Sequence, residues 1–258
     1  MDALTTYRLA ASNVERTIER LSTTPQIARE VEYYKENISN VKSAQDLVED
    51  PRLLNFALKA HGLEEMGYAV AFMQKLLDGG TIDDDALANQ LTDPRYTEFV
   101  EDFDFTRFGS ATTSFDRVQT GIIDKYYQQT LEQEAGAQNT GARLAIYFER
   151  KSEGIENAFS ILGDPALLQF VQTTFSLSPQ MSFLSIDRQA EMINERLNIE
   201  DLQDPEFMEN LTNRFLALWD LNNPNSVSVP PLIAQPFGSQ PTLSLDVLSS
   251  IQKVRSNF

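Results

Sequence analysis

The stretch Asp50-Pro51-Arg52-Leu53-Leu54-Asn55-Phe56 recurs 114 residues further along the chain as Asp164-Pro165-Ala166-Leu167-Leu168-Gln169-Phe170. Aspartate accepts hydrogen bonds from the free backbone N–H groups at a helix start, and its charge suits the positive end of the helix dipole. Proline at the first helical position sacrifices no hydrogen bond. Apolar residues at helical spacing follow in both copies. Each stretch therefore predicts the start of an amphipathic helix.

The same signal occurs twice more, at Asp93-Pro94 and at Asp204-Pro205, which are separated by 111 residues. When residues 28–63 are laid over residues 142–177 without a gap, ten of the 36 positions are identical. Ordinary composition would give about two or three identities by chance. The spacing therefore predicts an internal duplication, with two related halves.

Helical patterns dominate the rest of the chain. Leu144, Tyr147 and Phe148 begin an apolar stripe at spacings of three, four and seven that continues to position 162. Only 11 of 258 residues are glycine, and the best alternating run, Ser-Val-Ser-Val at 226–229, lies among prolines. We expect an all-α fold of two internally duplicated multi-helix halves packed into one helical unit, with a Pro-rich C-terminal tail.

The expected organisation has four parts. Residues 1–103 form the first half together with an N-terminal helix, and residues 104–137 form a Phe-rich loop and a connecting helix that starts near position 114. Residues 138–221 form the second half. Residues 222–258 form a Pro-rich linker with a short tail helix at 243–254.

Composition excludes several classes of function. The formal net charge is −17, so the field of the molecule repels nucleic acid and anionic membrane surfaces. Without cysteine there is no disulfide, thiolate nucleophile or Cys-ligated metal. No stretch approaches the roughly 18 apolar residues of a membrane span, and residues 1–21 lack a signal-peptide core. We therefore expect a cytoplasmic protein that binds neither nucleic acid nor a membrane.

Catalytic signals are weak. His61 is the only histidine, and the position 114 residues later holds Phe175, which favours a packing role near a helix end. Asp83, Asp84 and Asp85 favour capping of a helix that runs to position 91, with Mg²⁺ or Ca²⁺ binding as the alternative. Phosphate-binding glycine motifs and serine-nucleophile motifs are absent. We expect no catalytic, cofactor-binding or metal-binding residues, and no enzyme activity.

Two further sets of residues are candidates for function. Arg29 and Arg143 are retained at equivalent positions of both halves. A guanidinium that ties helices together is the favoured interpretation, and an anion site is the alternative. The Phe-rich stretch is either core or a surface for a protein partner. Its candidate partner residues are Phe103, Phe105, Phe108 and Phe115.

A further pattern runs along most of the chain in a fixed order. Its parts are Tyr33-Tyr34, Ala57-Leu58-Lys59-Ala60-His61-Gly62-Leu63, Ala86-Leu87-Ala88-Asn89-Gln90-Leu91, Asp93-Pro94-Arg95-Tyr96, Ala142-Arg143-Leu144-Ala145-Ile146-Tyr147-Phe148-Glu149-Arg150 and Ile186-Asp187-Arg188-Gln189. It resembles a family of alphaproteobacterial proteins of unknown function whose genes often lie within flagellar gene clusters. The resemblance covers residues 5–220 and implies association with the flagellum. It carries no known catalytic residues.

Three functional hypotheses follow. The favoured one is a non-enzymatic accessory or structural protein of the flagellum that acts by protein–protein contact; in a variant of it, the chain is an exported axial component. The second is a metal- or anion-dependent enzyme or a small-molecule binder, using the three aspartates or the Arg29 and Arg143 positions. The third is a regulator of flagellar gene expression that acts through another protein.

Overall fold

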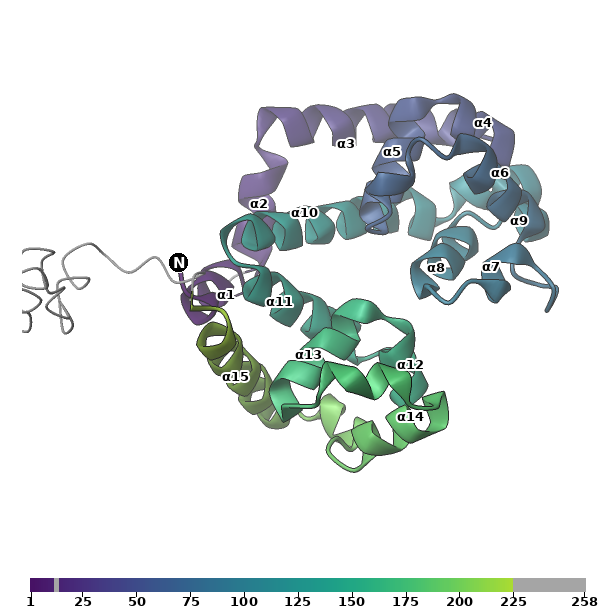
Figure 1. Ribbon diagram of the computed structural model, residues 1–258. Helices are drawn as coiled ribbons and strands as arrows, with labels where there is room; N and C mark the ends of the chain where they lie inside the picture. The colour runs from purple at the N-terminus through teal and green to yellow at the C-terminus, as the bar shows by residue number, and fades with distance from the viewer. Residues whose placement is uncertain (12–13, 225–258) are drawn as a thin grey trace, which may run out of the picture.

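The computed structural model describes residues 1–11 and 14–224, and this part of the chain is all-α, as predicted (Figure 1). The α-helices are α1 (Ala3–Ala11), α2 (Val14–Ser22), α3 (Pro25–Asn37), α4 (Ala44–Glu49), α5 (Pro51–Ala60), α6 (Val70–Gly79), α7 (Leu87–Gln90), α8 (Pro94–Asp102), α9 (Phe105–Phe108), α10 (Ile122–Gln138), α11 (Thr140–Ser152), α12 (Ala158–Gly163), α13 (Pro165–Phe175), α14 (Ile186–Asn194) and α15 (Pro205–Asn222). Short 3₁₀ segments and one π-helical turn (η4, Arg117–Gly121) connect them. No helix in the described ranges is long and apolar enough to cross a membrane. The alternating run at 226–229 and the tail helix at 243–254 lie outside the described residues.

All four Asp-Pro pairs begin a helix, which confirms the prediction from sequence. Asp50, Asp93, Asp164 and Asp204 are the N-cap residues of α5, α8, α13 and α15, and the following proline is the first helical residue in each case. Each aspartate side chain accepts a hydrogen bond from the backbone N–H two residues later. The carboxylate thus satisfies donors that a helix start otherwise leaves unpaired.

The two halves share local structure at the 114-residue spacing. α4 and α12 have the same length and begin after N-cap residues at equivalent positions, Ser43 and Asn157. α5 and α13 then follow directly from Asp50 and Asp164. The shared caps explain why the helices begin at equivalent places; common ancestry of the halves stays a prediction.

The first half has its own hydrophobic core. Tyr34 of α3 stacks on Phe56 of α5 with ring centroids 4.4 Å apart, and Phe56 stacks on Tyr126 of α10 at 4.1 Å. The Tyr34 hydroxyl is buried and donates to the Val118 carbonyl. Stacked rings bury a large apolar area, so they hold α3 and α5 against α10.

The second half repeats this arrangement with different neighbours. Phe148 of α11 stacks on Phe170 of α13 at 3.8 Å, and Phe170 stacks on Phe215 of α15 at 4.2 Å. All three rings are fully buried. Phe148 and Phe170 lie 114 residues after Tyr34 and Phe56, whereas the third ring comes from an element without that spacing.

The N-terminal segment does not belong to the first half alone, and our assignment of residues 1–103 to one half needs correction. Ala3 of α1 is buried in the second core, and its N–H donates to the Asp220 carboxylate at 3.0 Å. The Tyr7 hydroxyl donates to Glu149 Oε1 at 2.6 Å. Leu21 of α2, by contrast, is buried in the first core. The two N-terminal helices therefore tie the halves together.

α10 and α11 run between the two halves and pack against each other (Figure 1). Asn139 ends α10 and is the N-cap of α11, where its side chain accepts from the Gly141 N–H at 2.8 Å. A Cβ on Gly141 would overlap the indole ring of Trp219. The sharp connection between α10 and α11 thus depends on the Asn139 side chain, which caps α11, and on Gly141, whose lack of a side chain leaves room for Trp219.

Candidate functional site

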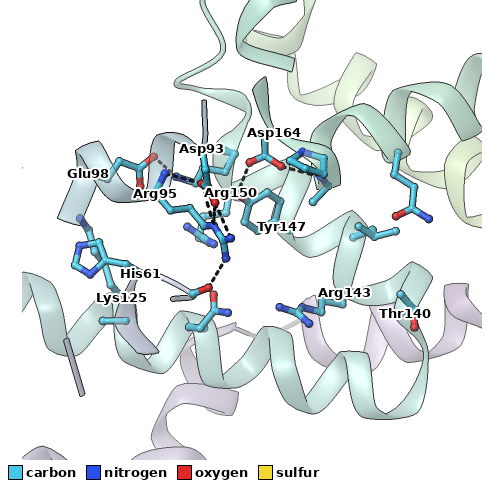
Figure 2. Close-up of a pocket in the computed structure, with 18 residues that line it drawn as sticks. His61, Asp93, Arg95, Glu98, Lys125, Thr140, Arg143, Tyr147, Arg150 and Asp164 are labelled. Atoms are coloured by element: carbon cyan, nitrogen blue, oxygen red, sulfur yellow. Dashed lines mark hydrogen bonds and ion pairs between the residues drawn. The ribbon is translucent and has the colours of Figure 1, made fainter. Parts of the chain in front are cut away.

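A cavity of about 360 Å³ lies between the two halves (Figure 2). Its walls come from the C-terminal end of α5, from α8, α10 and α11, and from the first turn of α13. Figure 2 shows His61 and Lys125 toward one end and Arg143 and Thr140 toward the other, with Tyr147 between them. Elements far apart in the sequence therefore build one concave site.

Five cationic side chains line this cavity, and four of them have a carboxylate partner. The pairs are Arg95 with Asp93, Lys125 with Asp102, Arg150 with Glu132 and Lys151 with Glu98. Glu132 is fully buried, and its Oε2 atom has no hydrogen-bond partner among the described residues. These four pairs cancel their charges locally, so they hold the walls in place rather than supply a charge for a ligand.

Arg143 is the fifth cation, and it forms no hydrogen bond or ion pair with any described residue. Its side chain is exposed at the cavity, and its stem packs on α10 beside Gly136, where a Cβ would lie 2.8 Å from Arg143 Cδ. Arg29, at the equivalent position of the first half, is exposed on α3 and is likewise unpaired among the described residues. The expectation that these arginines tie helices together is wrong, because neither reaches a carboxylate or a carbonyl.

Gln129 is a second unpaired polar group in the cavity wall. The residue is only 5% exposed, and its amide forms no hydrogen bond within the described part of the chain. The Gln129 amide atoms are not among the fully buried side-chain atoms without a partner, so they keep access to the cavity and carry unused hydrogen-bonding capacity into it.

Tyr147 of α11 and Asp164 at the start of α13 also line the cavity. The Tyr147 hydroxyl donates to Asp164 Oδ2 at 2.5 Å, and burial with the nearby Asp164 charge raises the pKa of Tyr147 far above its usual value. Arg150 lies over the Tyr147 ring, 5.1 Å from its centroid. The tyrosine therefore stays neutral and presents a rigid aromatic face.

His61 has the packing role predicted for it. It ends α5, its side chain is 1% exposed, and its ring meets Phe99 edge-on. Nδ1 lies 2.8 Å from the Ala57 carbonyl and Nε2 lies 2.8 Å from Asp102 Oδ2. The Nδ1 contact stays within the end of α5, and the Nε2 contact with Asp102 holds α5 against α8.

The three adjacent aspartates do not cap a helix, which corrects our prediction. α7 begins only at Leu87, and its N-cap residue is Ala86, which makes no side-chain cap. Asp83, Asp84 and Asp85 lie in the exposed turns before it. No group of three or more metal-ligating side chains occurs in residues 1–11 or 14–224.

The Phe-rich stretch divides between core and surface. Phe103 is fully buried, so its assignment to a partner surface is wrong. Phe105 packs half-buried against the first core, and Phe108 meets Phe115 at 4.9 Å beside the Arg117 guanidinium. Phe115 is the most exposed of the four, at 37%.

The expected helix near position 114 begins later in the structure. A 3₁₀ segment and a π-helical turn come first, and α10 begins only at Ile122.

A larger exposed apolar surface lies on the second half, and sequence reasoning did not find it. We call it the loop patch: Phe183 is 87% exposed, Ile186 58%, Phe159 48% and Leu184 45%. Three of these residues come from the connection between α13 and α14 and the start of α14, and Phe159 comes from α12, which packs against α14. The adjacent Phe183 and Leu184, with serines on both sides, are the sequence signal that was available.

Comparisons with known proteins place this fold in a family. The model of the family described as "Protein of unknown function (DUF1217)" matches residues 60–208, more than half of the chain. The crystal structure of protein AGR_C_984 from Agrobacterium tumefaciens is 46% identical in sequence, with a TM-score of 0.80, and the match covers 86% of this chain and 94% of that one. No curated protein matches the chain. The chain therefore belongs to the DUF1217 family of proteins of unknown function.

Proposed function

We propose that this chain is a non-enzymatic accessory protein of the bacterial flagellum that acts by protein–protein contact. The loop patch is the observation that carries the proposal. It gathers four large apolar side chains on neighbouring elements, and Phe183 is 87% exposed. Large apolar side chains exposed on neighbouring elements are typical of protein-interaction sites, since water is a poor solvent for them. The resemblance to a family encoded in flagellar gene clusters supports the location.

The charge around the loop patch defines the partner's chemistry. Asp187 is exposed on α14, Glu153 and Glu156 are exposed in the connection between α11 and α12, and the chain carries a net charge of −17. Opposite charge at the rim of an interface steers association. The partner surface we expect is therefore an apolar helix face with a basic rim.

Capture from motile cells tests this proposal. A tagged chain is expected to retain a flagellar protein, and Phe183→Asp is expected to lose it, because the substitution places a charge at the centre of the patch. Leu9→Asp is the matched control, since Leu9 is 64% exposed on α1, away from the patch. Equal capture by both variants, or loss in both, contradicts a role for the loop patch.

Cell fractionation tests the flagellar location. The accessory role predicts the chain in the cytosol and at the flagellar base of motile cells. The exported variant predicts it in purified hook–basal bodies or in the culture fluid. Deletion of its gene should reduce spreading in soft agar, and unchanged spreading together with a cytosolic partner unrelated to motility would contradict both versions.

Binding of a small anion is the second candidate function. The unpaired guanidinium of Arg143 at the cavity favours it, and the loop patch plays no part in it.

A further inference from the structure

We infer that the cavity between the halves binds a small organic carboxylate with an apolar body, with the carboxylate on Arg143. At about 360 Å³ the cavity falls in the range of small-molecule sites. This inference rests on the second candidate function, the binding of a small anion at Arg143, and names the class of ligand. The site is separate from the loop patch, so its test does not depend on the proposed protein contact.

The charge of the ligand follows from the ion pairs in the walls. Each of the other four cations has its own carboxylate, and only Arg143 has none among the described residues. The Asp164 carboxylate also lines the cavity, but it accepts hydrogen bonds from the Tyr147 hydroxyl and from two N–H groups at the start of α13, so Arg143 is the charged group left for a ligand. A guanidinium also offers two parallel N–H donors, which fit the two oxygens of a carboxylate.

The position of Arg143 strengthens this match. It lies in the first turns of α11, near the positive end of the helix dipole, where a cation is disfavoured and an anion is stabilised. Figure 2 shows its guanidinium inside the cavity with no interaction drawn to it. Gly136 on α10 leaves room for the arginine stem, since a Cβ there would lie 3.3 Å from Arg143 Cβ.

Gln129 supplies an independent sign of a polar ligand. The residue is only 5% exposed and lines the same cavity, and its amide has no hydrogen-bond partner within the described residues. An amide that faces a cavity without a protein partner is free to hydrogen-bond a molecule that enters it. A carboxylate or another polar group of the ligand would accept from its NH₂.

The rest of the wall fits an apolar body. Leu144, the Tyr147 ring and the Pro165–Ala166 turn at the start of α13 present carbon atoms to the cavity. An apolar group that covers them gains the transfer free energy of the buried surface. The ligand would contact α10 and α11 and the first turn of α13 together, so it would also stabilise the contact between the halves.

Binding is tested with benzoate and cyclohexanecarboxylate as probes, by isothermal titration calorimetry and thermal unfolding of the full chain. Probes are titrated to about 10 mM, because weakly binding small ligands have dissociation constants on the order of 1 mM. We expect saturable binding of at least one carboxylate and a rise in Tm. Benzamide, the neutral analogue of benzoate, should not bind. Absence of saturable binding by both carboxylates, or equal binding of inorganic phosphate or benzamide, overturns the assignment.

Arg143→Gln is expected to weaken carboxylate binding at least about tenfold, since a charge-assisted hydrogen bond is lost. Arg29→Gln is the matched control, because Arg29 holds the equivalent position in the first half and is not part of the wall of this cavity. It should bind as the parent chain does. Unchanged affinity in Arg143→Gln, or the same loss in Arg29→Gln, contradicts the site.

Gln129→Met separates a binding role from a structural one. If the amide exists for a ligand, its replacement by a side chain of similar size raises the Tm of the unliganded protein and weakens carboxylate binding. A variant that is less stable and binds the carboxylate equally well shows that Gln129 serves the fold, and it removes this residue's support for the site.

Discussion

The Tyr147 hydroxyl donates a hydrogen bond to Asp164 Oδ2 at 2.5 Å, while Oδ1 of the same carboxylate caps α13 by accepting from the Ala166 and Leu167 N–H groups. Tyr33 and Asp50 repeat this geometry 114 residues earlier, with the hydroxyl 2.7 Å from Oδ2. One carboxylate thus fixes both the start of a helix and its contact with the preceding long helix. In the second half this arrangement also forms a wall of the cavity.

Asp164→Ala is expected to cost about 1–2 kcal/mol of unfolding free energy for the lost cap. A further cost of about 1–3 kcal/mol follows because the largely buried Tyr147 hydroxyl loses its acceptor. Asp50→Ala should cost less, since Tyr33 is more exposed than Tyr147. Urea unfolding of both variants measures the difference.

The control for this pair is Tyr147→Phe, which removes the hydroxyl and keeps the cap. The costs of Tyr147→Phe and Asp164→Ala should not add in the double variant, because both remove the same hydrogen bond. Additive costs would show that the two groups do not interact.

Gly141→Ala is expected to destabilise the chain by about 1–3 kcal/mol through overpacking, because the new Cβ would overlap the Trp219 ring. Trp219 is the only tryptophan, so its fluorescence follows unfolding and reports a displaced indole directly. Gly79→Ala is the control: no atom lies within 4 Å of a Cβ there, and alanine in a helix should leave stability unchanged or raise it by up to about 1 kcal/mol. Equal effects at both positions would contradict the packing argument.

Glu149→Gln is expected to preserve or raise stability at pH 7. Burial raises the pKa of Glu149 above its usual value, even though hydrogen bonds from Tyr7 and Thr212 oppose the shift. The folded state therefore binds the proton more tightly, and stability is lost as pH rises from 4.5 through the folded pKa. Glutamine keeps an oxygen that accepts from both hydroxyls and carries no charge to bury.

The gain from Glu149→Gln should shrink as pH falls below 4.5, and thermal unfolding between pH 3.5 and 7 measures it. Glu149→Ala is the contrasting variant, since it leaves the buried Thr212 hydroxyl and the half-buried Tyr7 hydroxyl without this acceptor, at a cost of about 1–3 kcal/mol. Loss of stability in the glutamine variant equal to that in the alanine variant would show that the negative charge itself is required.

Asp102→Asn is expected to reduce stability at neutral pH and to flatten its decline in acid. Burial acts to raise the pKa of Asp102, but the hydrogen bond with His61 and the Lys125 charge outweigh it, so the pKa lies below its usual value. A lowered folded pKa gives stability that is present above pH 3.8 and is lost as pH falls through the folded value. Asp83→Asn, at an exposed carboxylate without an ion pair in the described ranges, should keep the parental acid profile. Denaturant unfolding from pH 5 down to pH 2.5 compares the three proteins.

Interactions between residues close in sequence were predictable. The four Asp-Pro helix starts follow from hydrogen bonds that span two or three residues, so the printed sequence was enough. The packing of His61 near a helix end followed from the phenylalanine at the equivalent position. The prediction from the three aspartates was wrong, because Ala86 is the N-cap residue of the next helix and the acidic run stays in the turns before it.

Interactions across the fold were not predictable. Phe103 and Phe115 belong to one Phe-rich stretch, yet the first is fully buried and the second is the most exposed of the four. Only the packing of α8 and α10 decides which ring faces inward. In the same way, α1 joins the second core because its N–H and hydroxyl donors reach the carboxylates of Asp220 and Glu149. These acceptors are more than 140 residues away in sequence, so no local pattern predicts the contact.

The sequence by itself determined the helical class, the points at which the principal helices begin and the equivalence of Tyr33 with Tyr147, because caps and apolar periodicity act over a few residues. Only the tertiary structure decided that Arg143 stands unpaired at a cavity while Arg29 lies on open surface. The two arginines share the same local sequence context. What distinguishes them is the set of elements brought opposite each one, and that set is fixed by how the two halves pack around α10 and α11.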